Sequence, residues 1–210
     1  ASTKAFAAQV IALVLLVLHV AQEKEMPGVR VEEITRELLE LPELAEQAML
    51  TEGEVIRAAE HMRHAKLVFF LGRGADALVS LEGALKLKEI AYVATQESPA
   101  GEMKHGPLAL VEQGVYAVMG ATEASMREKL ASNIKEMQAR GGQVLAITTE
   151  GDELIPKIAE FTVRLPRSKF EFLNSLLSII PMQLLAYHLA RLNGCEIDQP
   201  RNLAKSVTVE

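Results

Sequence analysis

The stretch LVSLEGALKLKEIAYVATQESPAGEMKHG, residues 78–106, decides how this 210-residue chain is interpreted. Apolar residues recur at Leu78, Leu81, Leu85 and Tyr92, and this spacing predicts a helix that carries the four on one side. The helix is followed by VATQES, a short strand candidate, and then by a loop rich in Gly and Pro. A helix leading into a strand is the repeating unit of an α/β fold.

Three charged residues interrupt this helix. Glu82, Lys86 and Glu89 stand at i, i+4 and i+7, so they fall in one seam along its axis. Apolar side chains flank the seam on both sides, which indicates a protein-lined cleft rather than a solvated stripe. Two carboxylates with a lysine between them, in a desolvated place, could transfer protons. A helix laced by ordinary ion pairs explains the same three residues equally well.

His105 lies between Lys104 and the Gly106-Pro107 pair, in a loop that Gly and Pro bound on both sides. Backbone geometry rather than core packing positions a histidine in such a loop, which suits a catalytic role. The alternative is a surface histidine without a function, and this is the commoner case.

Three motifs, LEGALKLKEI (81–90), ESPAGEMKHGPLAL (97–110) and DQPRNLAKSVTVE (198–210), closely resemble the sugar-isomerase region of the glutamine–fructose-6-phosphate aminotransferases. The resemblance runs from Ala1 to Glu210 and keeps the family's order. In that family the region consists of two similar sugar-isomerase (SIS) domains. The chain is similar to the end of the first domain and to the whole of the second.

Composition limits the classes of function. The chain is 49% hydrophobic and 24% charged with a formal net charge of -6, which suits one good globular domain with something attached. The acidic balance gives no support to nucleic-acid binding. Cys195 is the only cysteine, so no internal disulfide is possible and a cytoplasmic location is expected. We expect no signal peptide, because no basic leader precedes the first helix, and the start at Ala1 suggests a piece of a longer protein.

The first 65 residues predict helices only. Residues 4–24 form a long apolar helix, which polar residues interrupt too soon for a membrane span, so we expect a buried packing helix and no membrane contact. Residues 31–50 and 51–65 predict two amphipathic helices, and Thr51 followed by Glu54 predicts a capping box. We expect residues 1–65 to be the helical C-terminal part of a first SIS domain.

From residue 66 onward, strands alternate with helices, which predicts a three-layer α/β domain with about five parallel strands in flavodoxin-like order. The expected strands are LVFFLG (67–72), VATQES (93–98), VYAVMG (115–120), QVLAITT (143–149) and FTVRLP (161–166), and the later helices are 123–140, 154–160 and 170–192, the last kinked by Pro181. The second SIS domain is expected over 66–193. The resemblance implies that the tail, 194–210, folds over the sugar site.

No phosphate anchor is evident. GRGAD (72–76) follows a strand and could cradle phosphate at a helix N-terminus, but a simple tight turn is the preferred interpretation of a lone G-x-G. The family holds its substrate phosphate with a Ser/Thr-rich loop of the first SIS domain, and no similar run is present here. TTEGDE (148–153) carries three acids and would repel phosphate. We therefore expect the anchor to lie upstream of Ala1.

The resemblance implies a role for each site residue. Glu89 matches the base that moves a proton between C1 and C2, Lys86 matches the lysine near O1 and the enolamine, and Glu82 matches the acid that orients the pocket. His105 matches a residue that assists ring opening from the partner subunit. Lys205 matches the lysine that forms an imine with the open-chain sugar.

Two further substrate contacts are expected from the resemblance, at Ser2 and Ala204, although a hydroxyl residue such as Ser2 is also an ordinary helix N-cap. No cofactor is expected, because a ketose-to-aldose shift passes through an enolamine by proton transfer. No metal is expected either. His61 and His64 stand at i and i+3, but no carboxylate or cysteine set completes a site.

The resemblance thus implies an aminotransferase and ketose–aldose isomerase that converts fructose 6-phosphate and glutamine to glucosamine 6-phosphate and glutamate. The glutaminase half is expected to be missing, because its cysteine stands at the mature N-terminus in the family and Cys195 lies far from that end. We expect the enzyme to be a homodimer, and we expect this chain to be inactive alone. Apolar faces in residues 4–65 are expected to pack on the missing first SIS domain. The alternative is a sugar-phosphate-binding or dimerisation module without catalysis. The seam, His105 and Lys205 argue against it, because a sensor needs neither a base nor an imine-forming lysine.

Overall fold

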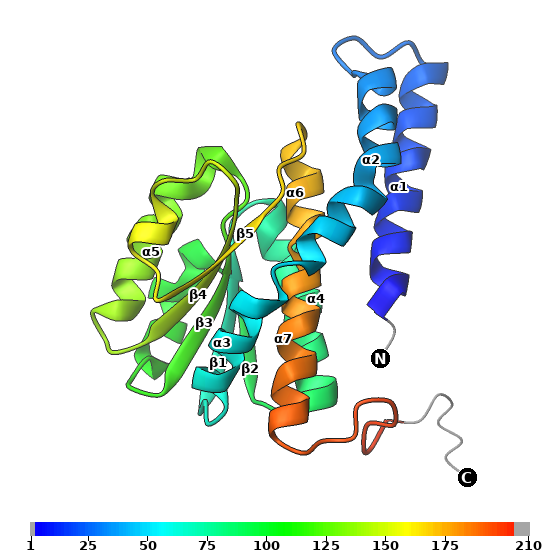
Figure 1. Cartoon of the computed structure of the whole chain (residues 1–210). Helices are drawn as coiled ribbons and strands as arrows, with labels where there is room; N and C mark the ends of the chain where they lie inside the picture. The colour runs from blue at the N-terminus through cyan, green and yellow to red at the C-terminus, as the bar shows by residue number, and fades with distance from the viewer. Residues whose placement is uncertain (1–2, 204–210) are drawn as a thin grey trace.

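In the computed structural model, which describes residues 3–203, a five-stranded parallel sheet lies between layers of helices (Figure 1). The strand order is β2-β1-β3-β4-β5, and every neighbouring pair is parallel, so the expected α/β fold with flavodoxin-like order is confirmed. The strands are β1 (Leu67–Gly72), β2 (Thr95–Pro99), β3 (Val115–Gly120), β4 (Gln143–Thr149) and β5 (Phe161–Leu165).

The α-helices are α1 (Thr3–Glu23), α2 (Val31–Met49), α3 (Glu52–Met62), α4 (Ala75–Ala91), α5 (Arg127–Gln138), α6 (Glu171–Leu177) and α7 (Ile179–Leu192). Short 3₁₀ turns are η1 (Ala100–His105), η2 (Pro107–Leu110), η3 (Ala124–Met126) and η4 (Ile155–Lys157). Helices α3, α4 and α7 cover one face of the sheet, and α5 covers the other (Figure 1). Continuous apolar strands such as β3 are buried throughout because both faces are covered.

Alternate residues of β1 divide the core between the two faces. Phe70 packs with the α4 and α7 side, whereas Phe69 packs with the α5 side. Gly83 lets α4 approach closely, because a Cβ at this position would overlap the Met182 side chain of α7 and lie 3.0 Å from Phe70. Helix α4 is therefore held firmly between β1 and α7, and its buried side is fixed by packing.

Helix α2 is attached to the domain through a buried carboxylate. Glu37 accepts hydrogen bonds from the Ser168 hydroxyl (2.7 Å) and the Lys169 backbone N–H (3.1 Å), and the Lys169 ammonium lies 2.9 Å away. These bonds, above all the one from Ser168, hold the pKa of Glu37 below its ordinary value of 4.5 in spite of burial. Glu37 thus joins α2 to the loop between β5 and α6.

We expect Glu37→Gln to lower the free energy of unfolding at pH 7 by about 1–3 kcal/mol, because a charged acceptor of two hydrogen bonds is lost. The pKa of Glu37 is lower in the folded state than in the unfolded state. Its contribution to the free energy of unfolding is therefore complete above about pH 4.5 and disappears as the pH falls through the folded-state pKa. Urea unfolding at pH 7 and near pH 3 should therefore show a difference between wild type and variant that shrinks in acid. Glu43→Gln, an exposed change on the same helix, should show no such difference.

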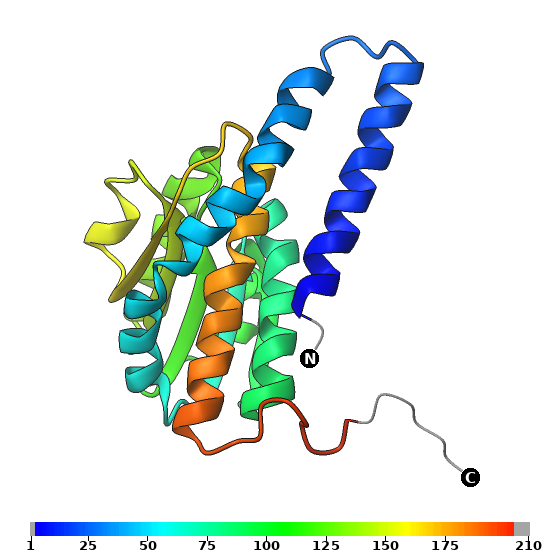
Figure 2. The ribbon, with the colours of Figure 1, turned by 45° about the vertical axis from the view of Figure 1, so that its right-hand side comes forward.

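Helix α1 is apolar but weakly covered. Leu13, Leu15, Leu16, Val17 and Val20 are exposed, each by 40% or more. By length and composition two helical stretches could cross a membrane, Thr3–Glu23 and Glu171–Leu192. Of an 18-residue apolar segment in each, 11% and 67% respectively is buried. Burial in the core accounts for the second stretch. The expectation that α1 is a buried packing helix is wrong for residues 3–203, because too little of this chain covers it (Figure 2).

Two local expectations are wrong and a third agrees with the structure. Thr51 forms no capping box, because its hydroxyl donates to the Ala48 carbonyl of the preceding helix (2.7 Å). The helix expected over 170–192 is interrupted at Ser178, three residues before Pro181, which agrees with the expected kink because the proline lacks a backbone N–H. Only the 3₁₀ turn Ile155–Lys157 forms in the segment expected to be a short helix.

Candidate functional site

The three charged residues of α4 form one connected ion-pair group. The Lys86 Nζ atom lies 3.2 Å from Glu82 Oε1 and 2.8 Å from Glu89 Oε2. The lysine side chain is 5% exposed, and the two carboxylates are 15% and 23% exposed. The helix therefore brings the expected seam together, with the cation buried between two partly accessible acids.

Glu89 stays partly accessible beside the lysine. Its Oε2 atom is buried 2.8 Å from the Lys86 ammonium, and no other group among residues 3–203 donates a hydrogen bond to it. The Glu89 side chain as a whole is 23% exposed, so a bound molecule can reach the carboxylate and transfer a proton to it. A partly accessible carboxylate that an ion pair holds in place meets the geometric requirement for a general base.

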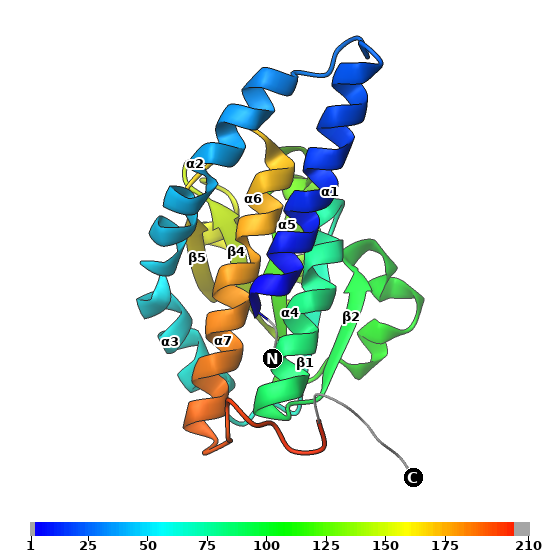
Figure 3. The ribbon, with the colours of Figure 1, turned by 90° about the vertical axis from the view of Figure 1, so that its right-hand side faces the viewer.

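The expected cleft is open on one side. Leu78, Leu81 and Leu85 lie next to the seam on α4 and are between 42% and 68% exposed. The expectation that apolar residues enclose the seam on both sides is therefore wrong within residues 3–203. The buried side of α4, including Leu87, faces β1 and α7 instead (Figure 3). An apolar surface beside a charged group is typical of a site that another protein surface completes.

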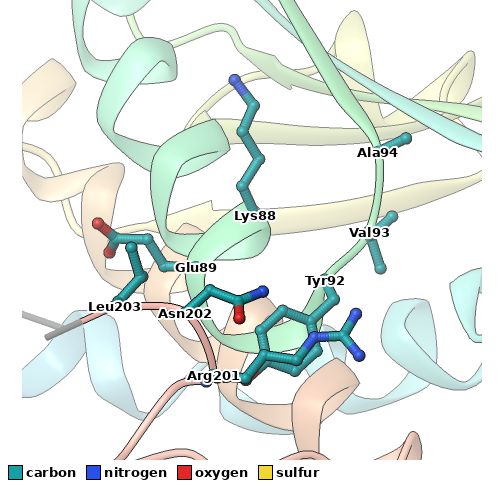
Figure 4. Close-up of a pocket in the computed structure, with 8 residues that line it drawn as sticks. All are labelled: Lys88, Glu89, Tyr92, Val93, Ala94, Arg201, Asn202 and Leu203. Carbon is teal, nitrogen blue, oxygen red and sulfur yellow. Dashed lines mark hydrogen bonds between the residues drawn. The ribbon is translucent and has the colours of Figure 1, made fainter.

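The chain after α7 returns to the end of α4 and forms a pocket there. This pocket has a volume of about 450 Å³. Its lining residues come from the end of α4, the segment before β2 and the tail, namely Lys88, Glu89, Tyr92, Val93, Ala94, Arg201, Asn202 and Leu203 (Figure 4). The tail segment 201–203 and the base candidate Glu89 thus share one pocket. Ser2, Ala204 and Lys205 lie outside the described residues.

His105 does not meet the seam. It is exposed at the end of η1, whose Ala100 and Met103 belong to the core on the α5 face. The neighbouring Lys104 pairs with Glu136 of α5 at 2.9 Å.

Glu89 lies on α4, which covers the opposite face of the sheet from α5. Glu89 is near the end of α4, before β2 begins, whereas η1 follows the carboxyl end of β2. The five residues of β2 therefore separate Glu89 from η1 by about 16 Å along the strand direction. Within one chain Glu89 and His105 are thus apart both along the strands and across the sheet.

The GRGAD segment is a turn that the chain's own carboxylate fills. The Ala75 N–H donates to Glu123 Oε1 at 2.6 Å. Gly74 has φ +57, and a Cβ there would overlap the Glu123 carboxylate. The acid occupies the position at the N-terminus of α4 where a phosphate would bind. This agrees with the tight-turn interpretation.

TTEGDE is also structural. Asp152 accepts hydrogen bonds from the Leu154 N–H (2.9 Å), the Ile155 N–H (3.2 Å) and the Thr148 hydroxyl. Its carboxylate lies 3.4 Å from Arg127 Nε. These contacts hold the turn after β4, and they leave an acid where a phosphate loop would need donors.

Asp76 is a buried carboxylate that the sequence did not indicate. It is fully buried at the carboxyl edge of the sheet and accepts hydrogen bonds from the backbone N–H and the hydroxyl of Thr122, both at 2.8 Å. Burial raises the pKa of Asp76 above its ordinary 3.8, against the effect of these hydrogen bonds. Its partner stands 46 residues away, so no local pattern could have indicated the pair.

His61, the first of the two histidines at i and i+3, has ordinary surroundings. His61 Nδ1 lies 2.8 Å from the Arg57 carbonyl, and a carbonyl only accepts, so this nitrogen carries the proton. The ring of His61 packs at 4.9 Å from that of Phe161. Within the part of the chain that the structure describes, no three His, Cys, Asp or Glu side chains gather as metal ligands would.

Comparison with known proteins finds a matching family model and similar curated proteins. The SIS domain family model matches residues 61–192. A glutamine–fructose-6-phosphate aminotransferase (isomerizing) of Caldanaerobacter subterraneus subsp. tengcongensis is 47% identical over 213 residues, which cover 100% of this chain and 34% of the relative. The chain thus spans about a third of the length of such curated relatives.

Solved structures agree. The C-terminal domain of glucosamine-fructose-6-phosphate aminotransferase from Francisella tularensis has a TM-score of 0.86 and 33% identity, covering 95% of this chain and 56% of that one. A structure described as glucosamine-6-phosphate deaminase from Thermotoga maritima has a TM-score of 0.73 and 26% identity, covering 98% and 57%.

Proposed function

The chain belongs to the SIS domain family, and from this we propose that it forms the C-terminal isomerase part of a glutamine–fructose-6-phosphate aminotransferase. The proposed reaction converts fructose 6-phosphate and ammonia derived from glutamine to glucosamine 6-phosphate, a step of amino-sugar biosynthesis. The observation that carries the proposal is the buried Lys86 between Glu82 and Glu89, because it fixes a Glu89 carboxylate that is still 23% exposed and can accept a proton.

In the proposed mechanism Glu89 takes the proton from C1 of the enolamine precursor and returns it to C2. One base must reach both carbons, which lie next to each other, so a single carboxylate near the pocket suffices. Lys86 stabilises the negative charge that develops at O1, and Glu82 holds the Lys86 ammonium in place. The reaction moves protons without net oxidation, so no redox cofactor is required.

Two residues of the proposed site do not lie on α4: Lys205 belongs to the tail, and His105 would come from the partner subunit. Lys205 forms an imine with the carbonyl carbon of the open-chain sugar and releases water, as the family resemblance implies; ammonia then replaces the lysine at that carbon, which leaves the sugar imine and the free Lys205 amine. His105 assists ring opening from the partner subunit of a homodimer. The exposed position of His105 supports this role, because a residue that serves a neighbouring copy must be accessible in its own chain.

The rest of the proposed enzyme lies in the part of the relatives that this chain does not match. There we place the glutaminase, the first SIS domain and the phosphate anchor, and we propose a cytoplasmic enzyme. The exposed leucines of α4 support a covering domain or subunit over the seam. The alternative is a sugar-phosphate-binding or dimerisation module without catalysis. The fixed and partly accessible carboxylate of Glu89 favours the enzyme, because a sensor has no use for a positioned base.

A chimera tests the proposal. The 210 residues replace the matching third of the Caldanaerobacter relative. We expect the chimera to form glucosamine 6-phosphate, whereas the isolated chain should neither turn over fructose 6-phosphate nor bind it at micromolar concentration. The reason is that the sugar's phosphate supplies much of the binding energy that positions C1 and C2, and the chain's own carboxylate fills the N-terminus of α4.

The measurements are a product assay for the chimera and calorimetric titration of the isolated chain with fructose 6-phosphate. An inactive but folded chimera would contradict the proposed function. Micromolar binding by the isolated chain would mean that it contains a phosphate anchor, contrary to the prediction.

A further inference from the structure

The tail contacts the end of α4 at Ala91, whose carbonyl accepts from the Cys195 thiol at 3.9 Å, and further along at Tyr92. The Arg201 backbone N–H donates to the Tyr92 hydroxyl at 2.8 Å. The Arg201 guanidinium also stacks on the Tyr92 ring, with its central carbon 4.2 Å from the ring centroid (Figure 4). One aromatic side chain thus holds both the backbone and the side chain of Arg201.

The backbone of Tyr92 is unusual for its residue type. It ends α4 in the left-handed conformation, with φ +56 and ψ +29, a position that glycine usually occupies. A bulky side chain here costs free energy, and such strain persists where the surroundings use it. The ring's contacts with Arg201 are a use of this kind.

The clamp, defined as Tyr92 with Arg201, sets the position of the tail relative to Glu89. Glu89 stands one helical turn before Tyr92, and Leu203 stands two residues after Arg201, and both line the same pocket. Fixing Arg201 therefore also limits how far Asn202 and Leu203 can move from the pocket that they line.

We propose that Tyr92 is a positioning residue, which clamps the tail at Arg201 and so holds residues 201–203 against the pocket while Glu89 acts. The inference rests on the proposed function for the role of Glu89. The clamp itself is a statement about this chain and can be tested without any activity.

Limited trypsin digestion of the 210-residue chain measures the clamp directly, because trypsin cleaves after Arg201 only when the tail is released. Cleavage of a transiently opened segment follows the population of the open form. We expect Tyr92→Phe, which keeps the ring, to raise the rate at Arg201 about fivefold by losing one hydrogen bond. Tyr92→Leu should raise it about 30-fold by losing both contacts.

Tyr187→Leu is the matched control. Tyr187 also carries an arginine over its ring, Arg191 at 5.7 Å, but both residues lie on α7. This variant should cleave at Arg201 at the wild-type rate. Equal rates at Arg201 for wild type and both Tyr92 variants would overturn the clamp, and thermal melting of each variant excludes general unfolding as the cause of a change.

The chimera supplies the second readout. Tyr92→Leu should lower kcat for glucosamine 6-phosphate formation about 10-fold or more with KM changed less, and Tyr92→Phe should restore most of kcat. Faster cleavage with an unchanged kcat would overturn the positioning role. An inactive wild-type chimera would count against the proposed function alone, since the digestion still decides whether Tyr92 holds the tail.

Discussion

Glu89→Gln in the chimera is expected to abolish glucosamine 6-phosphate formation while glutamine hydrolysis stays near its wild-type rate. The amide keeps the size of the side chain but removes the proton acceptor beside Lys86. Loss of a positioned general base lowers kcat by about 10²- to 10⁴-fold. Separate assays of glutamate release and amino-sugar formation measure the two outcomes.

Glu112→Gln is the control for this experiment. Glu112 also pairs with a lysine, Lys66 at 2.8 Å, but both side chains are more than half exposed and neither is among the residues that line the pocket. An exposed pair contributes little, so the control should keep both activities. Amino-sugar formation by Glu89→Gln within threefold of wild type would remove Glu89 from the role of base.

The strands and their order could be predicted from the sequence because they depend on composition over short windows. LVFFLG and QVLAITT are continuous apolar runs of strand length, and the segments between them have helical length, so a parallel sheet covered on both faces follows. The same reasoning failed where two local structures compete. The Thr51 hydroxyl could serve the helix before it or the one after it, and only the packed structure decides between them.

The part of the candidate site that lies on one helix, α4, could be predicted from the sequence. The spacing of Glu82, Lys86 and Glu89 alone places the three together, and the distances confirm that they meet. Which side of α4 is buried was not predictable, because leucines occur on both sides and the close contact at Gly83 decides the orientation. Leu85 is exposed for this reason.

The remaining parts of the site depend on partners far apart in the sequence. Glu123 fills the N-terminus of α4 from 48 residues away, and Arg201 reaches Tyr92 across 109 residues. Neither pair has a local signal, since an acid after a strand or an arginine in a tail is usually solvated. A single sequence contains the residues for such contacts but not the evidence that they meet.

His105→Ala and Glu89→Gln are expected to complement each other when the two chimera variants are expressed together. Each variant alone should be nearly inactive, since each lacks one required group. In one chain the two residues lie on opposite faces of the sheet, so one site must draw them from two copies if both act on one sugar.

In a two-fold symmetric dimer that shares its sites, a mixed dimer has one doubly altered site and one intact site. Half of randomly assembled dimers are mixed, so about a quarter of wild-type activity should return. Differently tagged subunits, purified in sequence, isolate the mixed dimer, which should reach about half of wild-type activity per dimer. The double variant His105→Ala with Glu89→Gln, paired with wild type, is the control, because its mixed dimers carry one defect in each site and should be nearly inactive. Mixed dimers of the single variants with no more activity than either parent would show that both residues serve the same subunit, and the chain would then have to bring His105 to Glu89 by a rearrangement of the segment after β2.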